Sequence, residues 1–203
     1  MIPLRSAQEE TVWQRVVSID ERLLLSVRRL ESRLLTRLMQ SLTRLGDPAS
    51  WICVGLALGL SGGEGPRYCA LLGTAAGLAL VVSQPLKRLC CRKRPSCGIG
   101  GFAALAENPD AFSFPSGHTA VAFAVAAAFA GQAGGLGALA LLLALAIAVS
   151  RVYLGAHYPL DVAAGALVGS LCGAAARLAL AQYPLLKLVG YATLAWTRSR
   201  SLS

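Results

Sequence analysis

The chain has 203 residues, of which 55% are hydrophobic and only 14% are charged, whereas a soluble globular domain carries roughly 25% charged residues. With a mean hydropathy of +0.58, the composition favours an integral membrane protein and excludes a disordered chain, a coiled coil and a collagen-like fibre. Lys and Arg outnumber Asp and Glu by 19 to 10, for a net charge of +9, which suits nucleic acid, anionic lipid or phosphate as a partner.

The N-terminal segment, residues 1–47, is polar and rich in arginine. Its first 20 residues lack the apolar run of a cleavable signal peptide. Between Ile19 and Leu45, apolar residues recur in steps of three and four, which predicts one amphipathic helix with arginines on its other face. Six arginines would be very costly inside a bilayer, so we expect this helix to lie in the membrane interface. A solvated helix packed on the protein, or a further span within residues 17–45, stays open.

Apolar segments with few charged residues follow, and each is expected to form a membrane-spanning helix. Their ranges are 48–63, 68–86, 118–131, 136–151 and 160–183. The 19 uncharged residues of 68–86 would make a helix about 28 Å long, enough for one crossing. The sequence therefore predicts an all-α membrane bundle of about five to six transmembrane helices, with a membrane domain over 48–186 and a polar tail over 187–203.

The six cysteines do not indicate a disulfide scaffold. Cys53, Cys69 and Cys172 fall in apolar runs, where a thiol behaves as a small hydrophobe. Three others, Cys90, Cys91 and Cys97, lie in a polar loop and either pair in an oxidising compartment or remain thiols. This loop contains no histidine, so a zinc site is a poor interpretation.

Connectivity gathers the unusual polar residues at one face of the membrane. The spans that end near Lys87 and Arg151 and those that begin near His118 and Asp161 have these ends on the same side. The set expected there is Lys87, Arg94, His118, Arg151, His157 and Asp161. Such a cluster of cations and histidines predicts a pocket for a phosphate-sized anion rather than a nucleic-acid surface.

Local chemistry agrees with an anion pocket. Ser116 can cap a helix start, and Gly117 lets the backbone amides approach an oxyanion at the positive end of the helix dipole. Pro159 suits the first turn of the last helix. Asp161 could then accept a hydrogen bond from one ring nitrogen of His157, leaving the other nitrogen as nucleophile or base.

Together these residues resemble the three-part signature of the type-2 phosphatidic acid phosphatase superfamily. The three blocks are Lys87-Arg-Leu-Cys-Cys-Arg-Lys-Arg94-Pro95, Pro115-Ser116-Gly117-His118, and Ser150-Arg151-Val-Tyr-Leu-Gly-Ala-His157-Tyr-Pro-Leu-Asp161. All eleven fixed positions match, in order. The first 50 residues and the C-terminal tail lie outside this signature.

The resemblance implies a membrane phosphatase that works without a metal or another cofactor. It implies that His157 attacks phosphorus to form a phosphohistidine, that Asp161 orients His157, and that His118 protonates the leaving oxygen and later helps to activate water. The residues implied to hold the phosphoryl oxygens are Lys87, Arg94, Arg151, Ser116 and Gly117.

The signature does not choose the substrate. A short chain of few spans is similar to the undecaprenyl diphosphate and lipid phosphate phosphatases, and phosphatidylglycerophosphate, phosphatidic acid and lipid A 1-phosphate are alternatives. A lipid-phosphate binding or transport protein is the non-enzyme alternative, and a vanadate haloperoxidase is disfavoured because those proteins are larger and soluble. The loop over residues 96–114 is either a gate for the lipid or a plain connector.

Two observations give opposite predictions of the membrane orientation. Family members commonly place the site on the external face of a bacterial cytoplasmic membrane. With five spans, however, the arginine-rich segment lies on the active-site side, which the positive-inside rule makes cytoplasmic.

Overall fold

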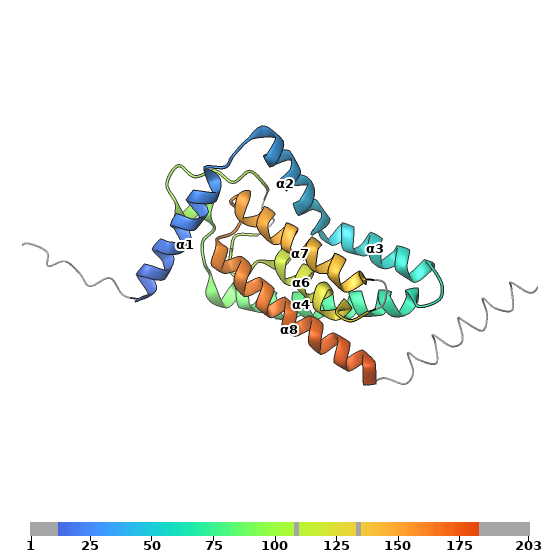
Figure 1. The fold of residues 1–203 in the computed structure, drawn as a ribbon. Helices are drawn as coiled ribbons and strands as arrows, with labels where there is room; N and C mark the ends of the chain where they lie inside the picture. The colour runs from blue at the N-terminus through green and yellow to red at the C-terminus, as the bar shows by residue number, and fades with distance from the viewer. Residues whose placement is uncertain (1–11, 108–109, 133–134, 183–203) are drawn as a thin grey trace, which may run out of the picture.

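The described part of the chain is a bundle of helices. The computed structural model describes residues 12–107, 110–132 and 135–182, and within these ranges the only β-type pairing is an isolated bridge between Lys93 and Phe112. The helices are α1 (Val12–Arg28), α2 (Arg33–Leu45), α3 (Pro48–Leu60), α4 (Gly65–Cys90), α5 (Pro95–Gly98), α6 (Gly117–Phe129), α7 (Leu136–Tyr153) and α8 (Pro159–Gln182) (Figure 1).

Each expected span is a helix close to its predicted bounds. In the described ranges, α4, α7 and α8 are long and apolar enough to cross a membrane. The apolar helices α3 and α6 have 13 residues each, which gives a length of about 20 Å. The all-α membrane fold is therefore confirmed. The predicted C-terminal tail, residues 187–203, lies outside the described residues.

The single N-terminal helix predicted from the leucine spacing is wrong, because the segment forms two helices. The chain leaves α1 after Arg28, and Ser32 begins α2 as its N-cap by accepting a hydrogen bond from the Leu35 amide at 3.3 Å. The amide of Ser32 in turn donates to the Tyr153 hydroxyl at 3.2 Å. Serine favours this capping role over the helix interior.

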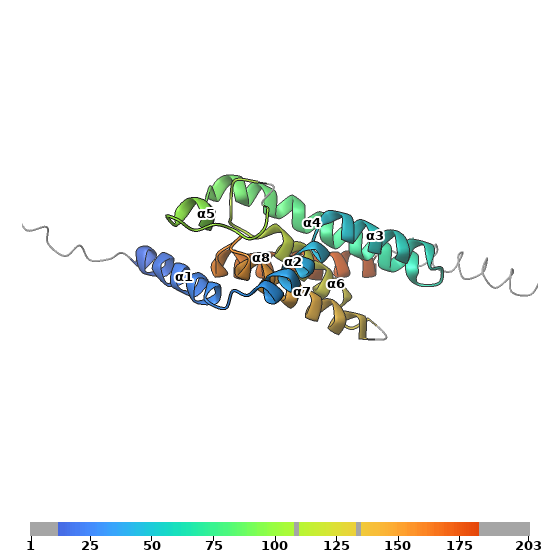
Figure 2. The same ribbon diagram turned by 90° about the horizontal axis from the view of Figure 1, so that it is seen from above.

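The two N-terminal helices occupy different positions on the bundle. Helix α2 packs against α7, whereas α1 contacts α7 and α8. Helices α1 and α5 both lie at the end of the bundle opposite the turn that joins α3 to α4 (Figure 2). Leucines of α2 such as Leu34 and Leu38 stay exposed, so this helix keeps an apolar surface away from the bundle.

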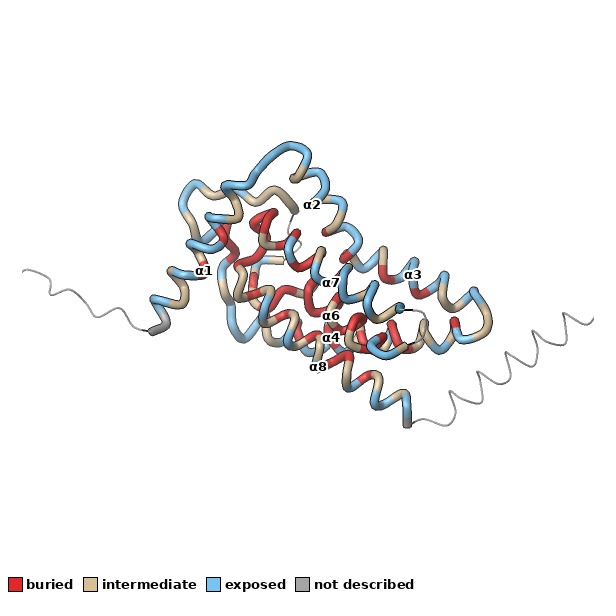
Figure 3. The backbone as a smooth tube through the Cα atoms, in the orientation of Figure 1, coloured by how far each residue is buried: buried red, intermediate tan, exposed pale blue. Residues whose placement is uncertain are grey.

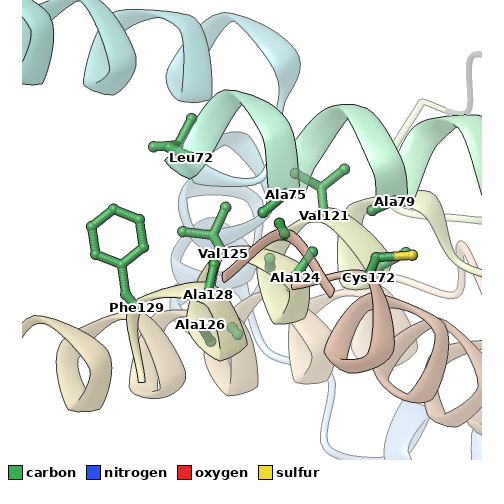
Figure 4. Packing of buried hydrophobic residues seen from close by; sticks show 14 of the residues in the cluster. Leu72, Ala75, Ala79, Val121, Ala124, Val125, Ala126, Ala128, Phe129 and Cys172 are labelled. Atoms are coloured by element: carbon green, nitrogen blue, oxygen red, sulfur yellow. The ribbon is translucent and has the colours of Figure 1, made fainter. Parts of the chain in front are cut away.

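Helix α6 lies at the centre of the bundle, in contact with α4, α7 and α8. Most of its residues are buried, as the red segments of Figure 3 show. Alanines make up most of its buried side chains, and Ala124 and Ala128 belong to one hydrophobic cluster with Phe129 and with Ala75 of α4 (Figure 4). Small residues let helix backbones approach closely in a membrane bundle.

Three glycines of α8 set its position against α6. A Cβ atom at Gly165, Gly169 or Gly173 would collide with the carbonyl oxygens of Ser116, Ala120 and Ala124, respectively. Because the glycines recur every four residues, they form one face of α8, and this face lies directly on the α6 backbone. The contact fixes the first turn of α8 beside the first turn of α6.

Candidate active site

The structure brings the six polar residues predicted to converge to one end of the bundle. Lys87 and Arg151 come from the last turns of α4 and α7, and His118 and Asp161 from the first turns of α6 and α8. Arg94 and His157 lie in the connecting segments. Lys87, Arg94 and Arg151 are close enough to interact electrostatically with one another. All of the six except His118 are buried, which is unusual for charged side chains without a functional reason.

His157 is held close to Asp161 and to Arg94. Its Nδ1 lies 3.7 Å from Oδ2 of Asp161, which is longer than a hydrogen bond, so the hydrogen bond expected between these residues is not formed in this structure. On the other side of the ring, Nε2 of His157 lies 3.4 Å from Nη1 of Arg94. The same Nη1 atom donates a hydrogen bond to the Ala156 carbonyl at 2.8 Å. The Nε2 atom therefore faces the cation that is implied to bind phosphate.

The imidazole of His157 is expected to remain neutral well below neutral pH. Burial lowers the pKa of His157 to about 3, and the positive charges of Arg151 and Arg94 act in the same direction, against the carboxylate of Asp161. A neutral imidazole has a free lone pair, which a nucleophile needs.

This neutral state can be observed directly, because the chain contains only two histidines. In ¹⁵N-histidine NMR spectra of the protein in micelles, we expect the His157 ring to show the neutral pattern at about pH 5, where an ordinary histidine of pKa about 6.5 is almost fully protonated. A His157→Gln variant assigns the signals. Titration of the His157 ring with a midpoint near its ordinary pKa would contradict this prediction.

Lys87 and Arg94 hold a carboxylate in this structure. The Nζ atom of Lys87 lies 2.5 Å from Oδ2 of Asp110, and Nη2 of Arg94 lies 2.5 Å from Oδ1. The Nε atom of Arg94 also donates to the Asp110 carbonyl at 2.8 Å. Burial tends to raise the pKa of Asp110, but the hydrogen bonds from both cations outweigh it and lower this pKa. The two cations thus form a cradle that binds an oxyanion.

The loop over residues 96–114, expected to be either a gate or a connector, delivers Asp110 to this cradle. It is attached to the rest of the protein in several places. The Leu105 amide donates to the Leu154 carbonyl at 2.8 Å, Gln40 of α2 donates to the Leu105 carbonyl, and Arg28 of α1 donates to the Ala103 carbonyl. These hydrogen bonds fix the loop to α1, to α2 and to the segment after α7.

The turn before α6 differs in one respect from its prediction. Ser116 is at the N-cap position, but its side chain caps no amide. Its hydroxyl instead accepts a hydrogen bond from Thr119 at 3.0 Å, and its amide donates to the Asp161 carbonyl at 3.0 Å. Nothing lies within 4 Å of a Cβ built on Gly117, so the start of α6 is sterically open for an oxyanion.

The sequence analysis did not predict two charged residues, Arg92 and Asp20, that form an ion-pair network with Asp161. Arg92, a variable position of the first block, donates to Asp161 at 2.7 Å and to Asp20 of α1 at 2.6 Å. Asp20 also accepts the Leu160 amide at 2.8 Å. Burial opposes the charge of Arg92, but the two carboxylates raise its pKa overall. Nothing in the local sequence of α1 marks Asp20 for this contact.

The sequence analysis also did not predict that the end of α2 and the turn that follows it contact the site. Thr43 accepts a hydrogen bond from Nη1 of Arg151 at 2.8 Å, and Asp47 lies 2.8 Å from Nε2 of His118. Both contacts join residues more than 70 positions apart. The signal available in the sequence was only that Asp47 directly precedes the first span.

Comparisons with known proteins match the part of the chain that contains these site residues. A model of the PAP2 superfamily matches residues 68–183. Decaprenylphosphoryl-5-phosphoribose phosphatase of Mycobacterium tuberculosis is 35% identical over 124 residues, which cover 61% of this chain and 68% of that protein. An undecaprenyl-diphosphatase of Sulfolobus acidocaldarius is 31% identical over 137 residues, covering 67% of this chain and 66% of that protein.

A solved structure is similar over most of its length. Aquifex aeolicus LpxE matches with a TM-score of 0.68 and 29% identity, covering 76% of this chain and 92% of that chain. The region matched by the family model exceeds half of this chain and contains all three blocks, from Lys87 to Asp161. The chain therefore belongs to the PAP2 superfamily, and it is a membrane phosphatase.

Proposed function

We propose that the protein hydrolyses a polyprenyl phosphate, with undecaprenyl diphosphate as the favoured substrate, through a metal-independent phosphohistidine mechanism. The observation that carries this proposal is the burial of His157 between Arg94 and Asp161, at the end of a membrane bundle where Lys87 and Arg94 already bind an anion.

In the proposed first step, Nε2 of His157 forms a bond to phosphorus while the bond from phosphorus to the leaving oxygen breaks. His118 gives a proton to that oxygen. In the second step a water molecule attacks phosphorus, its proton passes to His118, and the bond to nitrogen breaks to release phosphate. Asp161 stabilises the positive charge that develops on His157.

The phosphoryl oxygens are proposed to bind in the cradle of Lys87 and Arg94 and against Arg151. Arginine presents a planar fork of donors and lysine a point charge. The Ser116 hydroxyl and the Gly117 amide at the start of α6 add further donors. These groups stabilise the charge that develops on the oxygens in the transition state.

The choice of a polyprenyl substrate is supported by two relatives whose names state decaprenyl and undecaprenyl compounds as their substrates. Phosphatidylglycerophosphate, phosphatidic acid and lipid A 1-phosphate remain the alternatives. The exposed apolar surfaces of α4, α7 and α8 suit a substrate whose chain stays in the lipid while its phosphate reaches the site.

Phosphate release from a panel of these four lipids, by the purified full chain in detergent with EDTA, tests the proposal. We expect the highest kcat/KM for undecaprenyl diphosphate, no effect of EDTA, and no release by His157→Gln. A magnesium requirement, or full activity of the variant, would refute the mechanism. Binding of lipid without release, unchanged in His157→Gln, would favour the binding or transport alternative instead.

We further propose that the site faces the exterior of a bacterial cytoplasmic membrane, as the family resemblance implies. The arginines of α1 and α2 lie at the same end and give the opposite signal by the positive-inside rule. Cys90, Cys91 and Cys97 are exposed near the site. A membrane-impermeant maleimide is expected to label them in intact spheroplasts, and labelling only after permeabilisation would place the site on the cytoplasmic side.

A further inference from the structure

The turn from Thr43 to Asp47, which joins the last residues of α2 to the start of α3, contacts the site from outside the region that the family model matches. Asp47 is the N-cap of α3, a position at which aspartate ordinarily accepts a hydrogen bond from a backbone amide of the helix. Its side chain caps no amide of α3. Instead its Oδ1 lies 2.8 Å from Nε2 of His118. The Asp47 side chain therefore binds the His118 ring and does not cap its own helix.

The rest of the turn is shaped for this contact. A Cβ atom on Gly46 would come within 3.1 Å of Cδ2 of His118 and within 3.0 Å of Cγ2 of Ile147. A glycine at this position thus lets the turn sit directly against the imidazole ring. Thr43, buried one turn earlier, accepts a hydrogen bond from Arg151 at 2.8 Å, which ties the same turn to the proposed phosphate-binding cation.

We propose that Asp47 is the positioning residue for His118 and makes it an effective general acid toward poor leaving groups. This inference rests on the proposed function, in which His118 protonates the leaving oxygen. An ionised carboxylate only accepts hydrogen bonds, so Nε2 of His118 carries the hydrogen of this pair. Nδ1 is then the ring nitrogen that gives its proton to the leaving oxygen.

Proton balance follows from this assignment. The first step requires His118 as an imidazolium, and the carboxylate of Asp47 favours this charged form. After the step the proton of Nδ1 is on the departing alcohol, and the neutral ring keeps its Nε2 hydrogen on Asp47. In the second step the proton of the attacking water returns to Nδ1. Asp47 itself neither gains nor loses a proton, as with the aspartate of a catalytic triad.

The role of Asp47 is measurable because the need for an acid depends on the leaving group. Dodecyl phosphate releases a basic alkoxide that requires a proton, whereas 4-nitrophenyl phosphate releases a stable phenolate. For Asp47→Asn we expect kcat/KM to fall about 10- to 100-fold on dodecyl phosphate and to change little on 4-nitrophenyl phosphate. Gly46→Ala, which moves the turn away from the ring, is expected to give the same selective loss.

The matched control is Glu64→Gln. Glu64 is the N-cap of α4 and also caps no amide with its side chain, but it pairs with Arg67, and both side chains are exposed. We expect this variant to hydrolyse both substrates like the unmodified protein. In a His118→Ala background, Asp47→Asn is expected to cause no further loss on dodecyl phosphate, because the two residues act as one unit.

Equal losses on both substrates in Asp47→Asn would overturn the proposal, since they would indicate a structural role alone. Unchanged activity on dodecyl phosphate would overturn it as well, as would an additive loss in the His118→Ala background. If the unmodified protein hydrolysed neither substrate, or if kcat/KM fell equally on both substrates in His118→Ala, the proposed function of the site would fail, independently of Asp47.

Discussion

A His157→Gln variant is expected to release phosphate at least about 10⁴-fold more slowly than the unmodified protein, because loss of a nucleophile removes the whole covalent pathway. Glutamine keeps a polar side chain of similar length in the buried position between Arg94 and Asp161. The measurement is a rapid acid- and base-quench experiment with ³²P-labelled substrate. The unmodified protein is expected to carry label that is labile to acid and stable to base, and the variant is expected to carry none.

His118→Ala is the informative companion to this experiment. With 4-nitrophenyl phosphate, which needs no acid for the first step, the phosphoenzyme should form and then accumulate, because His118 is also proposed to activate the water. A phosphoenzyme that persists in His157→Gln would show that another residue is the nucleophile. Equal amounts of phosphoenzyme in both variants would contradict the division of roles between the histidines.

The second large effect is expected on folding, for Gly169→Leu. The Cα of Gly169 lies against the carbonyl of Ala120 so closely that even a methyl group would collide with the backbone of α6. A backbone cannot move aside as the end of a side chain can, so α6 and α8 must separate along their whole contact. We expect a loss of stability of more than ~3 kcal/mol, at or beyond the upper end of ordinary overpacking.

Thermal unfolding in detergent, followed by light scattering or a thiol-reactive dye, measures this loss. The matched control is Gly73→Leu on α4, where nothing lies within 4 Å of an added Cβ and the position is exposed. This control should melt at about the temperature of the unmodified protein. If Gly169→Leu melted there too, the helices would not be held by the close contact that the structure shows.

The spans and the convergence of their polar ends were predictable from the sequence for physical reasons. An uncharged run such as 68–86 has few alternatives to a membrane helix, and connectivity then decides on which side each end lies. The position of His157 before α8, and of Asp161 in its first turn, follows in the same way from Pro159.

The contacts from the N-terminal helices could not be predicted. The leucine spacing continues through residues 29–32, so periodicity alone gives no reason for the break that Ser32 makes. The pairs of Asp20 with Arg92 and of Asp47 with His118 join residues 72 and 71 positions apart. Such pairs depend on how α1 and α2 pack against α7 and α8, which the pattern of one isolated segment does not contain.

Asp110 occupies the two cations to which the substrate phosphate is proposed to bind. Because a carboxylate of the chain already neutralises Lys87 and Arg94, an incoming phosphate in the proposed mechanism takes part in an exchange of one anion for another. The same exchange runs in reverse when inorganic phosphate leaves, with Asp110 returning to the two cations. An internal counter-ion of this kind weakens the binding of substrate and product alike, and it thereby favours turnover over product inhibition.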